Sequence, residues 1–474
     1  MARIPRPRHT SEERPEDLVG VRQPVGRVIV VGAGMAGLTV ANALTHSGVE
    51  CVVLEARDRV GGRVHTVDLA GSPVDLGASW IHHPIGNPLR AFVAQAGIPV
   101  REGNPLSALA GYDLGAERRL FPDELRDNLT LVFETFPGAL DALQAELGAD
   151  ASVADGIGVF VSRAGLAGDS ARRARQALRA VVEADGADLA EHQSLRWLCN
   201  EVEYDGDLFG DLPVGGYRQI VDEMCTGLDV RLGADVDEVE VSAGGVRVQC
   251  ANGTTEVGSH AVVTAPLGVL KQGSIRFSPA LPTDHAAAIG RLGFGHYEKV
   301  ALRFDEPFWR RSGLGHMVIF PRDPAEATLW VINQDAFGAG PILVCEVLHS
   351  ASGHVLGRSR GEAVDWALGM LAHAVGHACP PPSAVAVTSW ADDPHCGGSY
   401  THVRPGASPS DADLLGQPVG GRLLFAGEHT QSDRLGYADG AMSSGIREAA
   451  RLLNRRDVQV HGSSHTEALQ ILEG

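Results

Sequence analysis

The stretch RVIVVGAGMAGLTVANAL, residues 27–44, indicates the fold class of this chain. An apolar strand leads into the glycine turn Gly32-Ala-Gly34-Met-Ala-Gly37, which opens a helix. The first glycine permits a tight turn, the second lets the backbone approach a pyrophosphate, and the third lets the helix pack closely on the strand. The phosphate would lie at the positive end of that helix. This order predicts a doubly wound α/β unit that binds a dinucleotide.

A second apolar strand, CVVLEA at residues 51–56, carries an acid near its end. Glu55 follows Gly32 by 23 residues, where such an acid accepts hydrogen bonds from an adenosine ribose. An acid there repels a 2′-phosphate, so NADP is not expected. Arg59-Val-Gly-Gly-Arg63 comes next and suits a second approach to the pyrophosphate. A hairpin turn with solvated arginines is the alternative.

Near its C-terminus the chain repeats the strand, turn and helix pattern. LLFAGEHT spans residues 423–430, and GYADGAMSSGIREAA spans 436–450. This second unit would aim another helix N-terminus at the ligand. A flavin needs such a positive end near its N1–C2=O edge, where negative charge develops on reduction. The pattern therefore favours FAD over NAD.

The length, composition and charge of the chain exclude several classes of protein and of partner. A chain of 474 residues exceeds what one hydrophobic core usually supports, so two connected domains or one elaborate domain are expected. The apolar and charged fractions, 44% and 21%, exclude a largely disordered or fibrous protein. The longest nearly apolar stretch, residues 28–41, is too short and too rich in glycine to span a membrane. The net charge of −19 argues against nucleic acid as the main partner and is compatible with a cationic substrate or simply with solubility.

The cysteines and the terminal segments of the sequence indicate the cellular compartment and the flexible parts of the chain. The seven cysteines lack paired spacing, so neither a disulfide framework nor a metal site is expected. The N-terminus has no apolar h-region, so we expect no secretory signal and a cytoplasmic protein. Residues 1–26 and 456–474 are expected to be flexible. The oligomeric state stays open, with a homodimer as one option.

Together these motifs resemble the FAD-dependent amine oxidase family, which includes monoamine oxidases, polyamine oxidases and flavin histone demethylases. The resemblance runs from Arg27 to about Leu453. Besides the C-terminal motifs it is carried by VGAGMAGL, LEARDRVGGRVHT, DLGASWIHHPIGNPL, VVTAPLGVLK, GFGHYEKVALRFDEPFW and WADDPHCGGSY. The segment GASWIHHPIGNPL is closest to the polyamine oxidase and demethylase branches, and the long helical insertion of the demethylases is absent.

The resemblance implies an α/β fold of two interleaved domains. A Rossmann-like FAD-binding domain would comprise residues 27–100, 225–290 and 400–455, and a substrate domain of mixed sheet plus helices would comprise 101–224 and 291–399. The implied partners are a small-molecule amine and O2, without a metal, nucleic acid or membrane. The residues implied to contact FAD are Gly32, Gly34, Met35, Ala36, Gly37, Glu55, Ala56, Arg57, Gly62, Arg63, Gly77, Ala78, Ser79, Trp80, Val236, Gly427, Glu428, Asp439, Ala441 and Met442.

Lys299 is the first candidate catalytic residue. It lies in an apolar strand pattern in which Val300 and Leu302 would alternate with it. A buried lysine is costly if it is charged and unpaired, so its presence needs a reason. In the family the matching lysine holds a water against flavin N5 and assists reoxidation by oxygen. A salt bridge to Glu298 or another acid is the alternative.

The remaining candidates would surround the substrate. Tyr400 and Tyr437 match two aromatic positions that flank the amine in the family, where aromatic faces steer and desolvate it. Trp390 would line the same wall. His82 matches a histidine near the substrate channel and would contact substrate or make a structural hydrogen bond. A group of acids could meet a distal ammonium or form a solvated loop: Glu201, Glu203, Asp205, Asp207 and Asp211.

The resulting prediction is an FAD-dependent amine oxidase. It would oxidise a C–N bond of a primary or secondary amine to an imine and reduce O2 to H2O2. Alternatives are an L-amino-acid oxidase, which needs an arginine facing the substrate carboxylate, and an oxidase that tailors a secondary metabolite. A flavoprotein that keeps FAD only as a scaffold is the alternative from another class. Ser399 occupies the position of the flavin-linking cysteine of monoamine oxidases, which predicts non-covalent FAD; Cys396 lies three residues too early.

Overall fold

The computed structural model describes residues 24–199, 201, 204–323, 326, 328–454, 458, 460 and 461. The leader and tail that were predicted to be flexible lie almost wholly outside these residues, as does Glu203.

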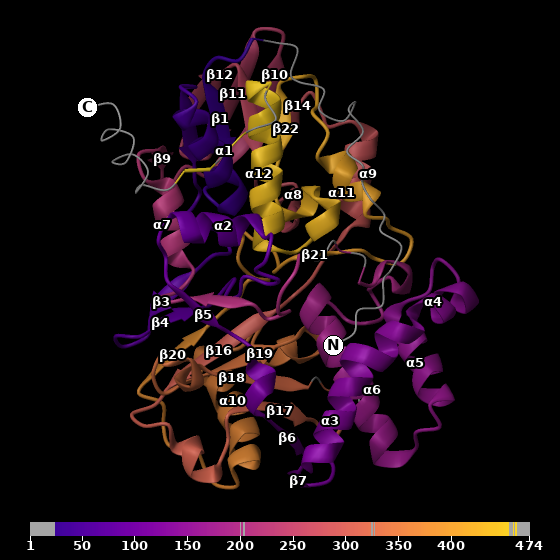
Figure 1. The fold of residues 1–474 in the computed structure, drawn as a ribbon. Coiled ribbons are helices and arrows are strands. Elements are labelled where there is room, and N and C mark those ends of the chain that lie inside the picture. The colour runs from indigo at the N-terminus through magenta and orange to yellow at the C-terminus, as the bar shows by residue number, and fades with distance from the viewer. Residues whose placement is uncertain are drawn as a thin grey trace.

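A five-stranded parallel sheet forms the upper half of the molecule in Figure 1. Its order is β22 (Leu423–Phe425), β13 (His260–Val263), β1 (Val28–Val31), β2 (Cys51–Leu54) and β9 (Asp229–Arg231). Strands β1, β13 and β22 are buried along their whole length. Such continuous apolar runs are typical of a parallel sheet covered on both faces.

Two helices from opposite ends of the chain pack together on this sheet. They are α1 (Met35–His46) and α12 (Ala438–Leu453), drawn in indigo and yellow in Figure 1. A side chain at Gly445 would crowd the Ala36 carbonyl and the Thr39 side chain, so this glycine permits the close approach. Helix α2 (Pro88–Gln95) contacts α12, and α7 (Arg218–Cys225) contacts α1.

A smaller sheet and three helices complete this half. The sheet has the order β12 (Thr255–Gly258), β11 (Gly245–Cys250), β10 (Val236–Ser242) and β14 (Arg276–Ser278). The helices are α8 (Leu267–Gln272), α9 (Thr283–Arg291) and α11 (Ser410–Leu415). Apolar residues of both sheets share one core, which includes Ile29, Val248 and Phe425.

A seven-stranded sheet forms the lower half (Figure 1). Its order is β20 (Ala384–Val387), β16 (Glu298–Arg303), β19 (Ile342–Val347), β18 (Leu329–Asn333), β17 (His316–Phe320), β6 (Leu109–Asp113) and β7 (Arg118–Arg119). All neighbours are antiparallel except β6 and β17. Val300 and Leu302 point to the core shared with α10 (Arg360–Val375), whereas Ala301 faces Val74 and Leu76 on the other side.

Helices gather beside this sheet, at the lower right of Figure 1. They are α3 (Pro122–Thr130), α4 (Phe136–Leu147), α5 (Val153–Arg163) and α6 (Gly168–Gly186), with a π-helical turn, Leu131–Thr135, between α3 and α4. Their apolar side chains pack against Val318 and Phe320 of β17. Two-stranded pairs connect the halves: β3 (Thr66–Asp68) with β4 (Pro73–Asp75), β5 (Val100–Glu102) with β8 (Asp211–Pro213), and β15 (Gly293–Phe294) with β21 (Thr401–His402).

The predicted α/β class with mixed sheets is confirmed. The parallel sheet draws its strands only from the segments predicted to bind FAD, and the seven-stranded sheet only from the segments predicted for the substrate domain. The domain boundaries themselves stay a prediction. Within the described residues, none of the helices has the length and apolar character needed to cross a membrane.

Candidate active site

The glycine turn after β1 shows a different constraint at each of its three glycines. Gly32 has a φ of +102°, which only glycine adopts readily. A Cβ at Gly37 would overlap the Gly32 carbonyl oxygen, so this glycine permits the helix to pack against the turn. A Cβ at Gly34 would meet no atom within 4 Å, so the backbone there borders open space. This is the cradle that a phosphate needs at the start of a helix, and Met35 and Ala36 form the first turn of that helix.

Glu55 ties the turn to the end of β2. Its Oε2 accepts a hydrogen bond from the Ala33 N–H at 2.7 Å, and its Oε1 accepts one from the Arg57 N–H at 3.0 Å. The side chain is buried, and each carboxylate oxygen has capacity for another donor. Glu55 therefore fixes the glycine turn and can still accept from a ribose hydroxyl.

The segment that begins at Arg59 lies against the first glycine turn and is not a solvated hairpin. Gly34 and Gly61 form a parallel bridge, and a Cβ at Gly62 would lie 3.4 Å from the Gly34 Cα. Arg59 folds back onto carbonyls of its own turn, including that of Gly62 at 2.9 Å. Arg63 leaves the turn and donates to Glu428 Oε1 at 2.9 Å and to the Ser399 carbonyl at 2.7 Å.

Glu428 joins the C-terminal motif to this centre. Its buried carboxylate also accepts from Thr401 Oγ1 at 3.0 Å and from the Gly436 N–H at 2.9 Å. Burial alone would raise the pKa of Glu428, but the charges of Arg63 and His429 and the hydrogen bonds from Arg63 and Gly436 together hold the pKa below its usual value. Gly427 donates its N–H to Ser444 Oγ, which anchors the turn to α12.

Asp439 is engaged within the protein and lies at the start of α12 with Ala441 and Met442. Its carboxylate accepts from the guanidinium of Arg434 at 2.7 and 3.2 Å, and both side chains are almost fully buried. The charge that Asp439 brings to this helix N-terminus is therefore largely neutralised.

The other predicted cofactor residues fall on neighbouring segments. Arg57 pairs with Asp393 at 2.7 Å and contacts Cys396 Sγ at 3.1 Å. Ala56 lies between Glu55 and Arg57, and Val236 begins β10, two residues after Ala234 donates its N–H to the Glu55 carbonyl. The open cradle at Gly34, the buried acid and the converging turns fit a bound dinucleotide.

Lys299 contacts another predicted segment. Its Nζ donates to the Ser79 Oγ at 2.7 Å, the Gly77 carbonyl at 2.8 Å and the Asp75 carbonyl at 3.2 Å. It also lies 5.9 Å from the centre of the Trp80 ring, and Ala78 donates its N–H to the Arg63 carbonyl. Burial lowers the pKa of Lys299, and the charges of nearby acids oppose that shift.

The alternative salt bridge between Lys299 and Glu298 does not form. Glu298 points to the opposite side of β16, as adjacent strand residues do. Its carboxylate accepts from the backbone N–H groups of Trp390 at 2.9 Å and Ala391 at 3.1 Å, and from the Thr388 hydroxyl. Trp390 donates its Nε1–H to the Leu76 carbonyl.

The two predicted aromatic residues, Tyr400 and Tyr437, reach the same end of α6. The Tyr400 hydroxyl donates to the Ala184 carbonyl, and the Tyr437 hydroxyl lies 3.4 Å from Asp185 Oδ1. Gly436 packs against the Tyr400 ring. Burial raises the pKa of both phenols well above the usual value, so both stay neutral donors. We refer to these two residues as the tyrosine pair.

His82 contacts the tyrosine pair through its ring. The His82 and Tyr437 rings are 5.5 Å apart and nearly perpendicular. The His82 Nδ1 lies 2.7 Å from the Leu208 carbonyl, so this nitrogen carries the proton. Burial lowers the pKa of His82 to about 4, which makes it a neutral and weak base at neutral pH. The structure therefore shows the structural hydrogen bond of His82. Its contact with substrate stays a prediction.

Ser399 and Cys396 both have protein partners. The Ser399 hydroxyl donates to the Tyr297 carbonyl at 3.0 Å and accepts the Tyr297 N–H at 2.8 Å. Cys396 is buried against Arg57.

The acidic segment near residue 205 forms a loop beside His82. The backbones of Asp205 and Asp207 pair with those of Ile85 and His83, and Asp211 pairs its carboxylate with Arg90 at 2.6 Å. Glu201 lies close enough to Tyr437 to raise the pKa of its phenol.

Three residues near the site were missed by the sequence analysis. Arg434 stacks 3.8 Å from the centre of the Tyr437 ring. Asp185 is the penultimate residue of α6 and lies beside Tyr437, and Glu346 in β19 lies across from Lys299. Glu346 alone left a signal, because it interrupts the apolar run ILVCEVL at residues 342–348. The other two stand in polar surroundings that do not distinguish them.

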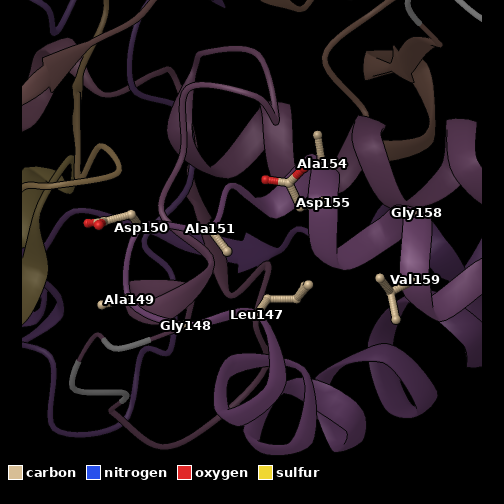
Figure 2. A pocket seen from close by; sticks show the side chains of 9 residues that line it. All are labelled: Leu147, Gly148, Ala149, Asp150, Ala151, Ala154, Asp155, Gly158 and Val159. Atoms are coloured by element: carbon tan, nitrogen blue, oxygen red, sulfur yellow. The ribbon is translucent and has the colours of Figure 1, made fainter.

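A surface hollow elsewhere holds none of the predicted site residues. Figure 2 shows it between the end of α4 and the start of α5. Its only ionisable groups are Asp150 and Asp155, and Asp155 already accepts from the Ser152 backbone. In the part of the chain that the structure describes, no cluster of His, Cys, Asp and Glu is suited to a metal ion.

The chain is similar to known proteins over most of its length. Residues 35–453 match the family described as flavin-containing amine oxidoreductase. The chain is 33% identical to polyamine oxidase 3 of Oryza sativa subsp. japonica, over 89% of this chain and 88% of that protein. It is 31% identical to polyamine oxidase 2 of Arabidopsis thaliana, with coverage of 89% and 87%. It is also 32% identical to lysine-specific histone demethylase 1 homolog 3 of Arabidopsis thaliana, but it spans only 31% of that longer protein.

Proposed function

The chain belongs to the flavin-containing amine oxidoreductase family. From this premise we propose that it oxidises a polyamine or a related cationic amine with O2. The observation that carries the proposal is the tyrosine pair at the C-terminal end of α6. Ser399, next to Tyr400, accepts a hydrogen bond from Arg63, whose segment forms a bridge to Gly34 of the dinucleotide cradle.

FAD is the cofactor of this family, and the residues described above would hold it. The turn at Gly34 would take the pyrophosphate, and Glu55 would accept from the ribose. Arg63 and Glu428 would support the opposite end through their ion pair of 2.9 Å. When bound, FAD accepts the hydride equivalent that the amine loses from its α-carbon.

The tyrosine pair would orient the amine. Aromatic faces attract an ammonium group and exclude water from it, which favours loss of its proton. The Tyr437 ring is held by Arg434 and His82, and both phenol hydroxyls are held by α6. The rings are thus positioned before substrate arrives, which is the main contribution that a protein makes to such a reaction.

Lys299 would serve the oxygen half of the reaction. A buried ammonium with fixed partners favours the negative charge that develops as O2 is reduced towards H2O2. Its neighbours Gly77 and Ser79 hold it in place without neutralising its charge.

A cationic substrate is favoured by the end of α6. The C-terminal end of a helix carries partial negative charge, and here it also presents the exposed carboxylate of Asp185. Two of the relatives named above are polyamine oxidases. An L-amino-acid substrate is disfavoured, because Arg434, the guanidinium that stacks on Tyr437, is already paired with Asp439.

The test is anaerobic mixing of the purified protein with putrescine, spermidine, spermine, phenylethylamine and a set of L-amino acids. We expect polyamines to remove the visible absorbance of the oxidised flavin fastest, and air to restore it with release of H2O2. Tyr112→Phe, at a tyrosine in β6 outside the site, is the control for Tyr437→Ala, which should slow this bleaching. Bleaching by amino acids alone would identify an amino-acid oxidase. No bleaching by any amine would favour the scaffold alternative.

A further inference from the structure

Glu346 is an acid buried in an otherwise apolar strand. It lies directly opposite Lys299 in the antiparallel pairing of β19 with β16. Residues directly opposite each other point to the same side of a sheet, so the two side chains share a face. Glu346 is only 7% exposed, and its Oε1 has no hydrogen-bond partner. A buried carboxylate oxygen without a donor is costly, so a compensating interaction is required.

Lys299 places a buried positive charge among acceptors that carry no negative charge. Three acceptors surround its Nζ, and the Ser79 hydroxyl donates its own hydrogen to the Gly77 carbonyl at 3.1 Å. A neutral amine has only two N–H donors, whereas an ammonium has three, so this geometry selects the ammonium. All three acceptors are neutral groups, and they leave the positive charge without a counter-charge.

Two acids face this ammonium from neighbouring elements. Asp75 of β4 already accepts from the Thr66 hydroxyl and from the Tyr217 N–H at 3.0 Å. Glu346 of β19 keeps an unpartnered oxygen. The phenol of Tyr297 shares a hydrogen bond with the Glu346 carboxylate. Burial raises the pKa values of the Tyr297 and Tyr400 phenols well above the usual value.

We propose that Glu346 is the counter-ion that keeps Lys299 protonated, and thus a positioning residue that acts through Lys299. The proposal deepens the function given above. It rests on that function only for the claim that the charge of Lys299 assists the reduction of O2. Electrostatics support it from both sides. Burial lowers the pKa of Lys299, and Glu346 is the strongest influence in the opposite direction. Burial raises the pKa of Glu346, and Lys299 is the strongest influence that opposes it.

The composition of the chain makes a direct test possible. Lys271 and Lys299 are the only lysines, so holoenzyme labelled with ¹³C at lysine Cε gives two side-chain signals. Lys299→Met assigns them. The Lys271 Nζ contacts the Gly290 carbonyl at 3.2 Å on the other half of the molecule and serves as the internal reference.

We expect Glu346→Gln to lower the midpoint of the Lys299 titration by about one to two pH units, the size of a close charge interaction at a partly screened site. The Lys271 midpoint should not move. Glu346→Asp, which keeps the charge, should restore most of the shift, and Glu346→Met replaces the glutamine variant if that variant does not fold. An unchanged Lys299 midpoint in the neutral variants, or a neutral Lys299 at pH 7 in the unaltered protein, would overturn the proposal.

This outcome is separate from that of the proposed function. The titration is recorded on oxidised protein without amine, so it reports only the lysine and its neighbour. If the titration contradicts the role of Glu346, the amine oxidation test still stands. If no amine on the panel is oxidised, the proposed role of Glu346 as counter-ion still stands.

Discussion

Replacing Glu55 with alanine should cost this protein much of its affinity for FAD. The carboxylate accepts two backbone N–H groups, from Ala33 at 2.7 Å and from Arg57 at 3.0 Å, and both bonds disappear in Glu55→Ala. These two bonds are present with or without FAD, so their loss mainly lowers the stability of the fold. The affinity falls because the ribose hydroxyls lose a charged acceptor, and a hydrogen bond to a charged group contributes about 1.5–3 kcal/mol. For one to two such bonds we expect a loss of about 2–4 kcal/mol, or about 30-fold to 700-fold in Kd.

The assay is the release of FAD during repeated ultrafiltration, followed by titration of the apoprotein with FAD to obtain Kd. Glu50→Ala is the matched control, because Glu50 also lies beside β2 but is 74% exposed and pairs with Arg27. Glu55→Gln keeps one acceptor oxygen and should fall between the two. Stoichiometric FAD in Glu55→Ala after the same washing, with Kd within threefold of the control, would refute the reasoning.

Three further perturbations test other parts of the site. Lys299→Met should slow reoxidation of the reduced flavin by O2 about 100-fold to 1000-fold, because a preorganised charge is lost, whereas the rate of anaerobic flavin reduction should change less. Equal reoxidation rates of the variant and the unaltered protein in stopped-flow measurements would show that Lys299 has another role. FAD should stay in the supernatant after acid precipitation, because Ser399 cannot form a thioether and Cys396 is held by Arg57; an intact mass increased by one FAD would contradict this. The free energy of unfolding should fall as pH is lowered from about 6.5 towards 4. Burial lowers the pKa values of His260, His316 and His429 to about 4 in the folded protein. Between this value and the ordinary pKa of about 6.5, the unfolded chain binds more protons than the folded protein does. Each histidine contributes up to about 1.4 kcal/mol per pH unit, so urea midpoints that do not change between pH 7 and 5 would show that these histidines are not buried in neutral form.

Local patterns predicted the elements whose constraints are local. The glycine turn with its flanking strand and helix needs particular residues at particular positions, and the structure contains this unit at residues 28–46. Helix α10, at Arg360–Val375, begins with a capping box at Ser359 and Glu362, which is another local sequence signal. The short pair of β5 with β8 was not predicted, because its strands are three residues long and meet across more than a hundred positions of sequence.

The residues of the site also fall into those that local sequence patterns predicted and those that depend on tertiary structure. Motif positions such as Lys299 and Tyr400 could be named because their segments carry recognisable patterns. Their partners could not, since Arg434 stacks on Tyr437 and Glu346 faces Lys299 through tertiary packing and strand register. Register between distant strands depends on the whole sheet, and one sequence does not reveal it. The lone acid in the run at residues 342–348 marked a site of interest without indicating its neighbour.

The order of strands in the parallel sheet has a consequence for synthesis on the ribosome. β13 lies between β1 and β22, and β22 is contributed by residues 423–425, near the end of the chain. Until that segment leaves the ribosome, β13 presents a bare, fully apolar edge, and α1 lacks the helix that covers it. Nascent chains that stop earlier expose a template for intermolecular strand pairing. A chain that has not yet reached residue 423 therefore depends on protection of this edge, and it also lacks the Glu428 and α12 side of the dinucleotide site.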